Sequence, residues 1–390
     1  MTTAYIVAAA RIAGGKRGGR LKDWHPADLG GAVIDAVLER SAVDPNAVED
    51  VVFGCVSQVG QQAYNIARYS ILVSNLPETV PGVTIDRQCG SSQQAIQFAA
   101  QAVMSGAQDV VIAGGVESMT RVPIMSPGIL AAEKGMGGPE SARLLARRPG
   151  FAANQFAGAE MLGRKYGFTR DDTDAFGLSS HQKAAASTRS ARFRNEIVPV
   201  SVQGPHGNSE MHETDEGIRF DANLAAVKGV RLLQEGGIIS AATSSQICDG
   251  ASAVLVANER ALKSYSLTPL ARIHQMTVLG GDPVIMLETP IPATALALKK
   301  AGMKIEDIDL YEVNEAFATV PLAWLKATGA DPERLNVNGG AIALGHPLGA
   351  SGAKLTTTLI HALKDRNKRY GLQTMCEGGG LANVTIYEAL

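Results

Sequence analysis

Short runs of β-branched and apolar residues alternate with helical stretches along most of this chain. The runs at 51–53, 83–86 and 109–113 have the length of strands, and apolar residues between them recur at helical spacing, as in 95–103. A chain that alternates strands with helices buries both in α/β layers. Further runs that predict strands lie at 4–8, 251–257, 310–313, 335–337, 374–376 and 383–387.

The same pattern occurs twice, weakly, in the two ends of the chain. Near the N-terminus a helix leads into Val43-Asp44 and then into the strand at 49–53, and near the C-terminus the helix at 292–301 leads into Met303-Lys304 and then 307–310. The length of 390 residues suits two or three domains. We expect two related α/β halves, with chance similarity of helix–strand units as the alternative.

The middle of the chain has a different composition. From about residue 117 to residue 235 it carries many charges, glycines and short helical pieces such as 170–187, with few strand-like runs. This composition predicts a large inserted segment with little sheet.

Overall composition excludes several classes of protein. Hydrophobic residues make up 45% of the chain and charged residues 19%, which is typical of a folded protein with large cores. The net charge of −2 and the lack of a basic face argue against a nucleic-acid partner. No apolar run is long enough to span a membrane, and no secretory signal is apparent, so we expect a cytoplasmic protein.

The four cysteines are widely spaced. Cys55, Cys89, Cys248 and Cys376 form no C-x-x-C pair, so we expect no zinc or other metal site. In a reducing compartment disulfides are rare, so each cysteine is either a packed apolar residue or a reactive thiol.

Two of the cysteines lie in patterns that suit chemistry. Cys89 follows a predicted strand and opens a helix at Gly90-Ser-Ser, a position that can lower the pKa of a thiol; a buried structural cysteine is the alternative. Cys376 ends a predicted strand and is followed by Glu377 and three glycines. Three glycines suit a place where backbone N–H groups face a ligand oxygen, and a flexible turn is the alternative.

Two further stretches carry candidate polar groups. His346 lies in a glycine-rich loop beside Pro347 and before a helix, where an imidazole can exchange protons near neutral pH, although a histidine that merely caps the turn is the alternative. Asn314 and Glu315 lie where a strand ends and a helix begins. Capping of the helix explains one of these two side chains and leaves the other free.

Together these four stretches resemble the thiolase family, and the resemblance extends over nearly the whole chain. The blocks 336–352, 314–318 and 376–380 are specific in combination, and the Val116-Glu117-Ser118 stretch looks more like degradative than biosynthetic thiolases. The resemblance implies two similar βαβαβαββ halves, stacked as five αβαβα layers, with an inserted loop domain. The expected boundaries are 1–120 plus 251–268 for the first half, 121–250 for the loop domain and 269–390 for the second half.

The resemblance also implies a role for each candidate catalytic residue. The cysteine matching Cys89 takes the acyl group as a thioester, and the histidine matching His346 activates it. The asparagine matching Asn314 holds a water in an oxyanion hole shared with His346. The cysteine matching Cys376 moves the proton of the α-carbon or of coenzyme A (CoA), and the backbone N–H of Gly378 joins that of Cys89 in a second oxyanion hole.

The expected ligands are acyl-CoA, 3-ketoacyl-CoA and CoA, which are substrates; no permanently bound cofactor is expected. By resemblance Ser245 contacts the pantetheine, Ala241 and Phe317 line its tunnel, and Arg219 lies near the nucleotide, with a solvated surface arginine as the alternative for Arg219. Thiolases act in lipid metabolism, including fatty-acid β-oxidation, and assemble as homodimers or homotetramers.

The chain departs from the common thiolase pattern at two places. Ala242-Thr243 replaces a frequent Gly-Asn, and Asn154-Gln155-Phe156 replaces the His-Met-Gly of biosynthetic members. Thiolases that act on steroid side chains are similar at both places, so a bulky acyl group is one possibility. A biosynthetic acetoacetyl-CoA thiolase, a ketoacyl-synthase-like enzyme and a non-catalytic CoA-binding homologue remain as alternatives, and Glu377 has no assigned role.

Overall fold

The computed structural model describes residues 2–149, 151, 154–204 and 207–390. The first half of the fold is built on five strands in the order β4-β3-β5-β9-β1. Their bounds are β1 Tyr5–Ile12, β3 Asp50–Gly54, β4 Gly82–Ile85, β5 Val110–Ser118 and β9 Cys248–Ala257. Strand β3 pairs in parallel with both β4 and β5, whereas β9 pairs antiparallel with β5 and β1.

The second half repeats this topology. Its strands are β10 (Ala271–Gly280), β11 (Leu310–Val313), β12 (Tyr370–Glu377) and β13 (Leu381–Ala389). Strand β11 pairs in parallel with β12, and β13 pairs antiparallel with β12 and β10. A parallel bridge from Tyr311 to Leu335 takes the place that β4 has beside β3. The two-half architecture that the sequence predicts is therefore present in the structure.

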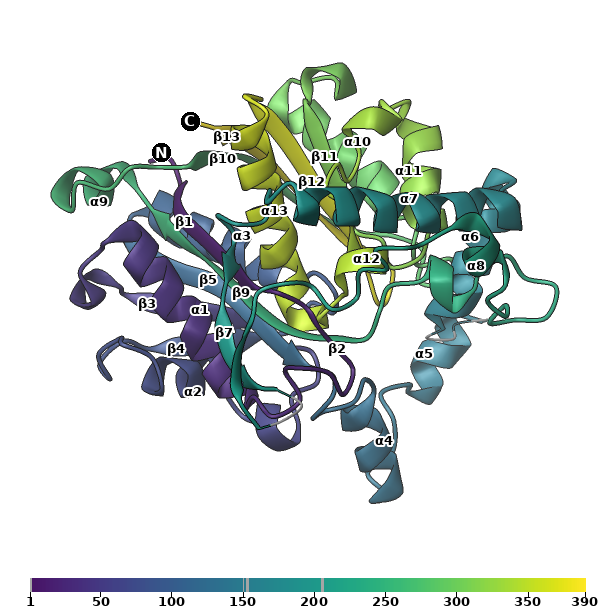
Figure 1. Ribbon diagram of the computed structural model, residues 1–390, viewed down its shortest axis with the longest axis horizontal. Coiled ribbons are helices and arrows are strands. Elements are labelled where there is room, and N and C mark those ends of the chain that lie inside the picture. The colour runs from purple at the N-terminus through teal and green to yellow at the C-terminus, as the bar shows by residue number, and fades with distance from the viewer. Residues whose placement is uncertain (1, 150, 152–153, 205–206) are drawn as a thin grey trace.

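The two half-sheets meet through the short antiparallel pairing of β1 with β10, at Tyr5 with Arg272 and Ile6 with Ala271. Helices α3 (Ser91–Ser105) and α13 (Ser351–Asp365) pack on each other and on strands of both halves. Helices α1 (Pro26–Ser41) and α2 (Ile66–Leu72) cover the other face of the first half, and α10 (Pro290–Ala301) and α11 (Thr319–Thr328) that of the second. This arrangement gives the five layers (Figure 1).

Burial of apolar side chains on the inner and outer faces holds these layers together. One core lies between α1, α2 and the first half-sheet, around Phe53 and Ile34. A second lies around the α3–α13 pair, and a third lies between α10, α11 and the second half-sheet, around Trp324. Strands buried on both faces form continuous apolar runs, which explains why β5 and β9 stand out in the sequence.

The middle of the chain contains mainly helices. They are α4 (Ser126–Glu133), α5 (Ala142–Arg147), α6 (Gln155–Tyr166), α7 (Arg170–Arg189) and α8 (Leu224–Lys228). The strands here are short: β6 (Ile197–Val198), β7 (Val200–Gln203) and β8 (Ser209–His212). Figure 1 shows α4 and α5 extending away from the layered body, whereas α7 crosses in front of it.

Two details differ from the sequence-based expectation. Strand β10 has ten residues and was not predicted, because its polar residues interrupt the apolar run. The run at 335–337 forms only isolated bridges and no strand. The remaining elements are the short strand β2 (Gly15–Lys16), helices α9 (Glu259–Ser264) and α12 (Ala341–Leu344), and 3₁₀ turns at Pro45–Ala47, Gly60–Gln62, Ala241–Thr243, Ile305–Asp307, Pro332–Arg334 and Leu348–Ala350.

Candidate active site

The N-terminal ends of α3 and α13 lie side by side at the centre of the molecule. The Ala353 N–H donates to Ser92 Oγ at 2.9 Å. A Cβ on Gly352 would lie 2.1 Å from the backbone nitrogen of Gln93, so only glycine permits this close approach. The packing brings together the two loops that precede these helices, one carrying Cys89 and the other His346.

Cys89 lies two residues before the first residue of α3 and is buried. Its side chain packs with Met119 and Leu348, so residues of both loops share one small apolar cluster. Burial and the nearby Glu377 carboxyl raise the pKa of the Cys89 thiol to about 12. A thiol pKa below the usual value, as expected at a helix start, is therefore not found in the free protein, because loss of water is the largest effect on Cys89. The thiol therefore needs a base at the moment of reaction.

The His346 ring is buried and held from one side, close to Cys89 in the structure. Its Nδ1 lies 2.5 Å from Ser351 Oγ, and that hydroxyl donates to the Pro347 carbonyl at 2.8 Å. The hydroxyl can therefore only accept from His346, which places the ring hydrogen on Nδ1 and makes Nε2 the acceptor atom of the ring. Burial and Lys354 lower the pKa of His346 to about 3, so the imidazole is neutral at physiological pH.

Asn314 and Cys376 come from neighbouring strands of the second half. The Asn314 Nδ2 lies 3.4 Å from His346 Nε2, and the Asn314 N–H donates to the Thr374 carbonyl at 3.0 Å. Cys376 is the next-to-last residue of β12 and is buried. Burial raises the pKa of the Cys376 thiol well above its usual range, and the nearby Cys89 and Glu377 raise it further. The structure thus places the two cysteines close enough to influence each other.

The glycines after Cys376 form the turn between β12 and β13. Gly379 and Gly380 have φ of +85° and +80°, a conformation that other residues rarely adopt. A Cβ on Gly378 would lie 3.1 Å from Gln88 Oε1, so this peptide faces the residue just before Cys89. Glycine is therefore favoured by backbone conformation at Gly379 and Gly380, while Gly378 packs closely against the Gln88 side chain.

Glu315 has a structural role in the same region. Its carboxylate accepts hydrogen bonds from Ser180 Oγ at 2.6 Å, Asn336 Nδ2 at 2.9 Å and the Ile342 N–H at 3.1 Å. These bonds connect α7 of the inserted segment to the loop that leads to His346. Of the two polar residues in the Asn314-Glu315 pair, one therefore faces the histidine and the other fixes the backbone.

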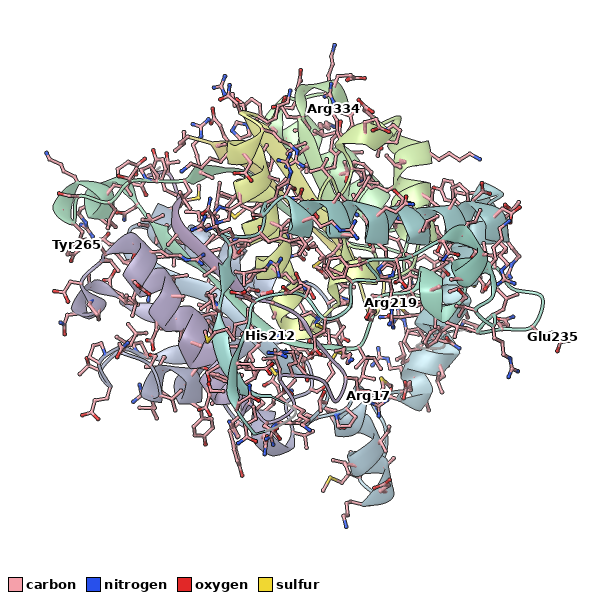
Figure 2. All side chains as sticks on the ribbon, in the orientation of Figure 1. Arg17, His212, Arg219, Glu235, Tyr265 and Arg334 are labelled. Atoms are coloured by element: carbon pink, nitrogen blue, oxygen red, sulfur yellow. The ribbon has the colours of Figure 1, made fainter. Side chains whose placement is uncertain are left out.

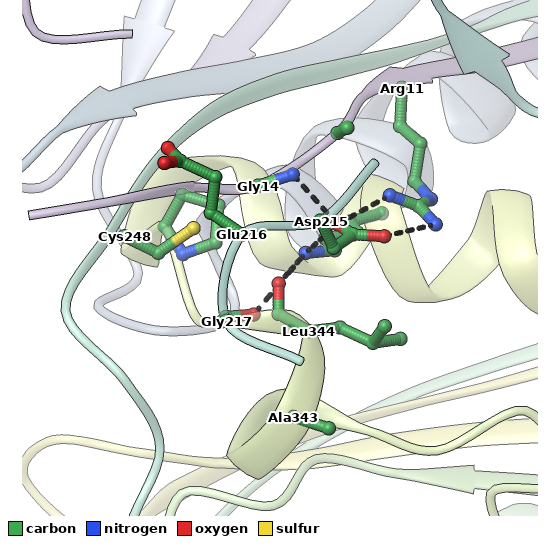
Figure 3. A network of polar contacts seen from close by, with 12 residues as sticks. Arg11, Gly14, Asp215, Glu216, Gly217, Cys248, Ala343 and Leu344 are labelled. Atoms are coloured by element: carbon green, nitrogen blue, oxygen red, sulfur yellow. Dashed lines mark hydrogen bonds and ion pairs between the residues drawn. The ribbon is translucent and has the colours of Figure 1, made fainter. Parts of the chain in front are cut away.

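A buried ionic network supports the His346 loop from behind. Arg11 binds both oxygens of Asp215, at 2.9 and 3.0 Å, and the Gly14 N–H donates to the same carboxylate at 2.7 Å (Figure 3). Burial alone would raise the pKa of Asp215, but Arg11 and Lys354 lower it to about 2. Lys354 also donates to the Leu344 carbonyl at 2.5 Å, two residues before His346.

Of the four residues expected to contact CoA, three lie together. The Ser245 N–H donates to the Ala316 carbonyl at 2.9 Å, and Ser244 forms a bridge with Phe317. Ala241 opens the 3₁₀ turn just before them and is exposed. Arg219, labelled in Figure 2, is also exposed, and its N–H donates to His181 Nδ1 at 3.1 Å. No hydrogen bond or ion pair among the described residues joins Arg219 to the other three.

Sequence reasoning missed several residues of this site. Ser351 holds His346, Lys354 holds its loop, and the Gln155 side chain acts on the Cys89 thiol to lower its pKa. Only Gln155 carried a signal, as part of the unusual Asn154-Gln155-Phe156 run. Among the described residues no cluster of three or more histidine, cysteine or acidic side chains could hold a metal ion, and no helix is long and apolar enough to cross a membrane.

Comparison with known proteins agrees with this geometry. The model of the thiolase N-terminal domain matches residues 4–260, and that of the C-terminal domain matches residues 267–389. The chain is 52% identical to a steroid 3-ketoacyl-CoA thiolase of Mycobacterium tuberculosis, over 100% of this chain and 95% of the relative. It is 41% identical to a 3-ketoacyl-CoA thiolase of Yersinia enterocolitica, over the full length of both.

A solved structure has the same fold. The crystal structure of human mitochondrial 3-ketoacyl-CoA thiolase superposes with a TM-score of 0.90 at 34% sequence identity, covering 100% of this chain and 99% of the human one. Both domain models and full-length relatives therefore agree with the arrangement of the two halves. The chain belongs to the thiolase family and is an acyltransferase of the degradative type.

Proposed function

We propose that this protein cleaves a 3-ketoacyl-CoA with CoA, using Cys89 as the nucleophile and Cys376 as the acid–base thiol. The observation that carries this assignment is the meeting of two buried cysteines from opposite halves, beside a neutral histidine. In the reverse direction the same groups would condense an acyl-CoA with acetyl-CoA.

In the first half-reaction, His346 Nε2 takes the proton of Cys89 and the thiolate attacks the keto carbon of the substrate. The bond between the α-carbon and that carbonyl then breaks, and its electron pair forms the enolate of acetyl-CoA. Cys376 gives its proton to the α-carbon, and acetyl-CoA leaves with Cys89 acylated. Splitting the reaction in this way is covalent catalysis.

In the second half-reaction, the Cys376 thiolate takes the proton of the incoming CoA thiol. The CoA thiolate attacks the thioester on Cys89, and the departing Cys89 thiolate takes back the proton from His346. His346 would help to hold the enolate oxygen, and Asn314 would hold a water in the same oxyanion hole. The N–H groups of Cys89 and Gly378 would stabilise the oxyanion on the acylated carbon. Such donors each contribute about 3–4 kcal/mol in other enzymes.

We infer that the acyl group of the substrate is bulky, because the chain is 52% identical to a steroid 3-ketoacyl-CoA thiolase. Phe156 is 54% exposed and makes an edge-to-face contact with Phe317, with ring centroids 5.5 Å apart. An exposed aromatic ring beside the proposed pantetheine site offers apolar surface to a large acyl chain. We infer that Ser245, Ala241, Phe317 and Arg219 contact CoA.

Three further assignments complete the proposal. The protein acts in the cytoplasm in lipid degradation. Its first half comprises residues 1–120 plus 251–268, its loop domain residues 121–250 and its second half residues 269–390.

The protein forms a dimer or tetramer. This assembly is supported by the edge strand β4, where Val83 is 43% exposed, and by Tyr64 nearby in the chain, which is 87% exposed. Light scattering at micromolar concentration tests the assembly, and a mass of one chain contradicts it.

The activity is tested by CoA-dependent cleavage of acetoacetyl-CoA, a medium-chain 3-ketoacyl-CoA and a 3-ketoacyl-CoA with a steroid-sized side chain. We expect the highest kcat/KM for the bulky substrate. A preference for acetoacetyl-CoA would favour a biosynthetic role instead.

His346→Ala should slow acylation of Cys89 by more than the hundred- to thousandfold loss of a single oxyanion donor, and Asn314→Ala should slow it by less. Normal acylation in His346→Ala would show that His346 is not the base.

A further inference from the structure

Glu377 is a buried carboxyl group that the proposed mechanism does not use. Its side chain is fully buried, and neither carboxyl oxygen has a hydrogen-bond partner among the described residues. Buried carboxyl groups are normally hydrogen-bonded, so an unpartnered one in a reaction centre calls for an explanation.

The position of this carboxyl is fixed by close packing. A Cβ on Gly90 would lie 1.8 Å from Glu377 Oε1, so the carboxyl rests directly on the peptide that follows Cys89. Glu377 itself directly follows Cys376 in β12. The carboxyl is therefore adjacent in the chain to one reactive thiol and in contact with the residue next to the other.

The surroundings of Glu377 decide its charge. Burial raises its pKa to about 8, while Arg87 and the Asn383 backbone act in the opposite direction. The other titratable groups near Glu377 are the thiols of Cys89 and Cys376. Asp86, which lies in the same loop as Arg87, raises the pKa of Cys89. At neutral pH the carboxyl is mostly protonated, and the region around the two thiols then carries less negative charge.

We propose that Glu377 controls the reactivity of Cys89 through its charge: the enzyme acylates Cys89 readily while Glu377 is a neutral acid, and ionisation of Glu377 slows this step. The inference rests on the proposed function, in which negative charge develops on the Cys89 sulfur as its proton passes to His346. A carboxylate in contact with Gly90 would oppose that charge. Glu377 acts through Cys89 and is a positioning residue; no contact with substrate is needed.

The test is the pH dependence of acyl transfer to Cys89, measured as the burst of acyl-enzyme after mixing with a 3-ketoacyl-CoA. In the wild-type protein the burst rate should be level near pH 7 and should fall about tenfold as the pH rises through about 8, where Glu377 ionises. A tenfold fall corresponds to a change of one unit in the pKa of the Cys89 thiol. In Glu377→Gln, which keeps the shape and cannot ionise, the rate should stay level. Asp86→Asn is the control and should keep the alkaline fall.

A second measurement needs no variant. Alkylation of Cys89 by iodoacetamide, followed by peptide mass spectrometry in the wild-type protein, should rise tenfold per pH unit, flatten near pH 8 and then rise again. A straight line through this range would overturn the inference, as would an equal alkaline fall in Glu377→Gln and wild type. If wild-type protein forms no acyl-enzyme on Cys89 at any pH, the proposed function fails instead.

Discussion

The ends of β5 and β12 occupy equivalent places in the two halves but carry different chemistry. Gly115 of β5 pairs with the last residue of β3, and Thr374 of β12 pairs with the last residue of β11. Two residues further along each strand lie Glu117 and Cys376. The helix starts agree with this equivalence: Cys89 lies two residues before α3, and Gly349 lies two residues before α13.

The two strand ends differ in how fully their polar groups are satisfied. Glu117 accepts hydrogen bonds from the N–H groups of Val56, Ser57 and Gly349 at 2.8–3.0 Å, and from Gln62 Nε2 at 2.8 Å. At the neighbouring ends of β11 and β12, in contrast, Asn314 Oδ1 and both oxygens of Glu377 have no partner within the described ranges. The polar group at the end of β5 is fully used in hydrogen bonds, whereas the second half keeps polar atoms without partners next to the proposed catalytic residue Cys376.

The largest expected effect is on the β12 side. Cys376→Ser should reduce kcat for thiolysis by about ten-thousandfold, because a serine hydroxyl is a poor acid–base group for the α-carbon. Acylation of Cys89 by a simple acyl-CoA should persist, since that step moves no α-proton. Steady-state rates, the acyl-enzyme burst and exchange of α-protons with deuterium measure these effects. Normal α-proton exchange in the variant would show that Cys376 has another role.

The matching change on the β5 side should affect stability. Glu117→Ala leaves three backbone donors, the half-buried N–H of Val56 and the buried N–H groups of Ser57 and Gly349, without an acceptor, while Gln62 keeps its bond to the Ser57 carbonyl. The change should lower the free energy of unfolding by about 3 kcal/mol. Urea unfolding followed by circular dichroism measures this change. Glu117→Gln is the milder control, because its amide keeps one acceptor. Unchanged stability in Glu117→Ala would remove the structural role that we assign to this half.

The first residues of α3 and α13 give a smaller contrast. Ser351 accepts from His346, whereas Ser91 donates to the Gln88 carbonyl at 2.6 Å and accepts from the Arg87 N–H. Ser351→Ala should reduce the rate of Cys89 acylation by about tenfold, because the imidazole loses its fixed tautomer. The burst rate after normalisation to folded protein is the measurement, and acylation at the wild-type rate contradicts the role of Ser351.

The smallest expected effect concerns acid pH. Burial keeps the pKa of His346 near 3, so the base stays neutral and acylation should be level between pH 5 and 7. In the unfolded chain the imidazole has its usual pKa near 6.5 and binds a proton at lower pH. The contribution of His346 therefore lowers stability as the pH falls below 6.5. Half-loss of the burst rate near pH 6.5 would contradict this assignment.

Much of the fold follows from local sequence. Strands buried on both faces, such as β5 and β9, are continuous apolar runs and can be predicted from the sequence alone. Strand β10 is not predicted from the sequence, because its exposed or half-buried positions hold His274 and Gln275 among apolar residues. In the site, Cys89, His346 and Cys376 are recognisable by their glycine-rich surroundings. The contact of Glu377 with Gly90 is not, because it depends on how the two halves pack.

The central claim is that Cys89 of the first half carries the acyl group while Cys376 of the second half moves the proton. The most direct test is to mix the protein with a 3-ketoacyl-CoA in the absence of CoA, quench with acid and map the acyl group by peptide mass spectrometry. We predict an acyl group on the peptide that contains Cys89 and none on the peptide that contains Cys376. An acyl group on Cys376, with Cys89 unmodified, would contradict the account.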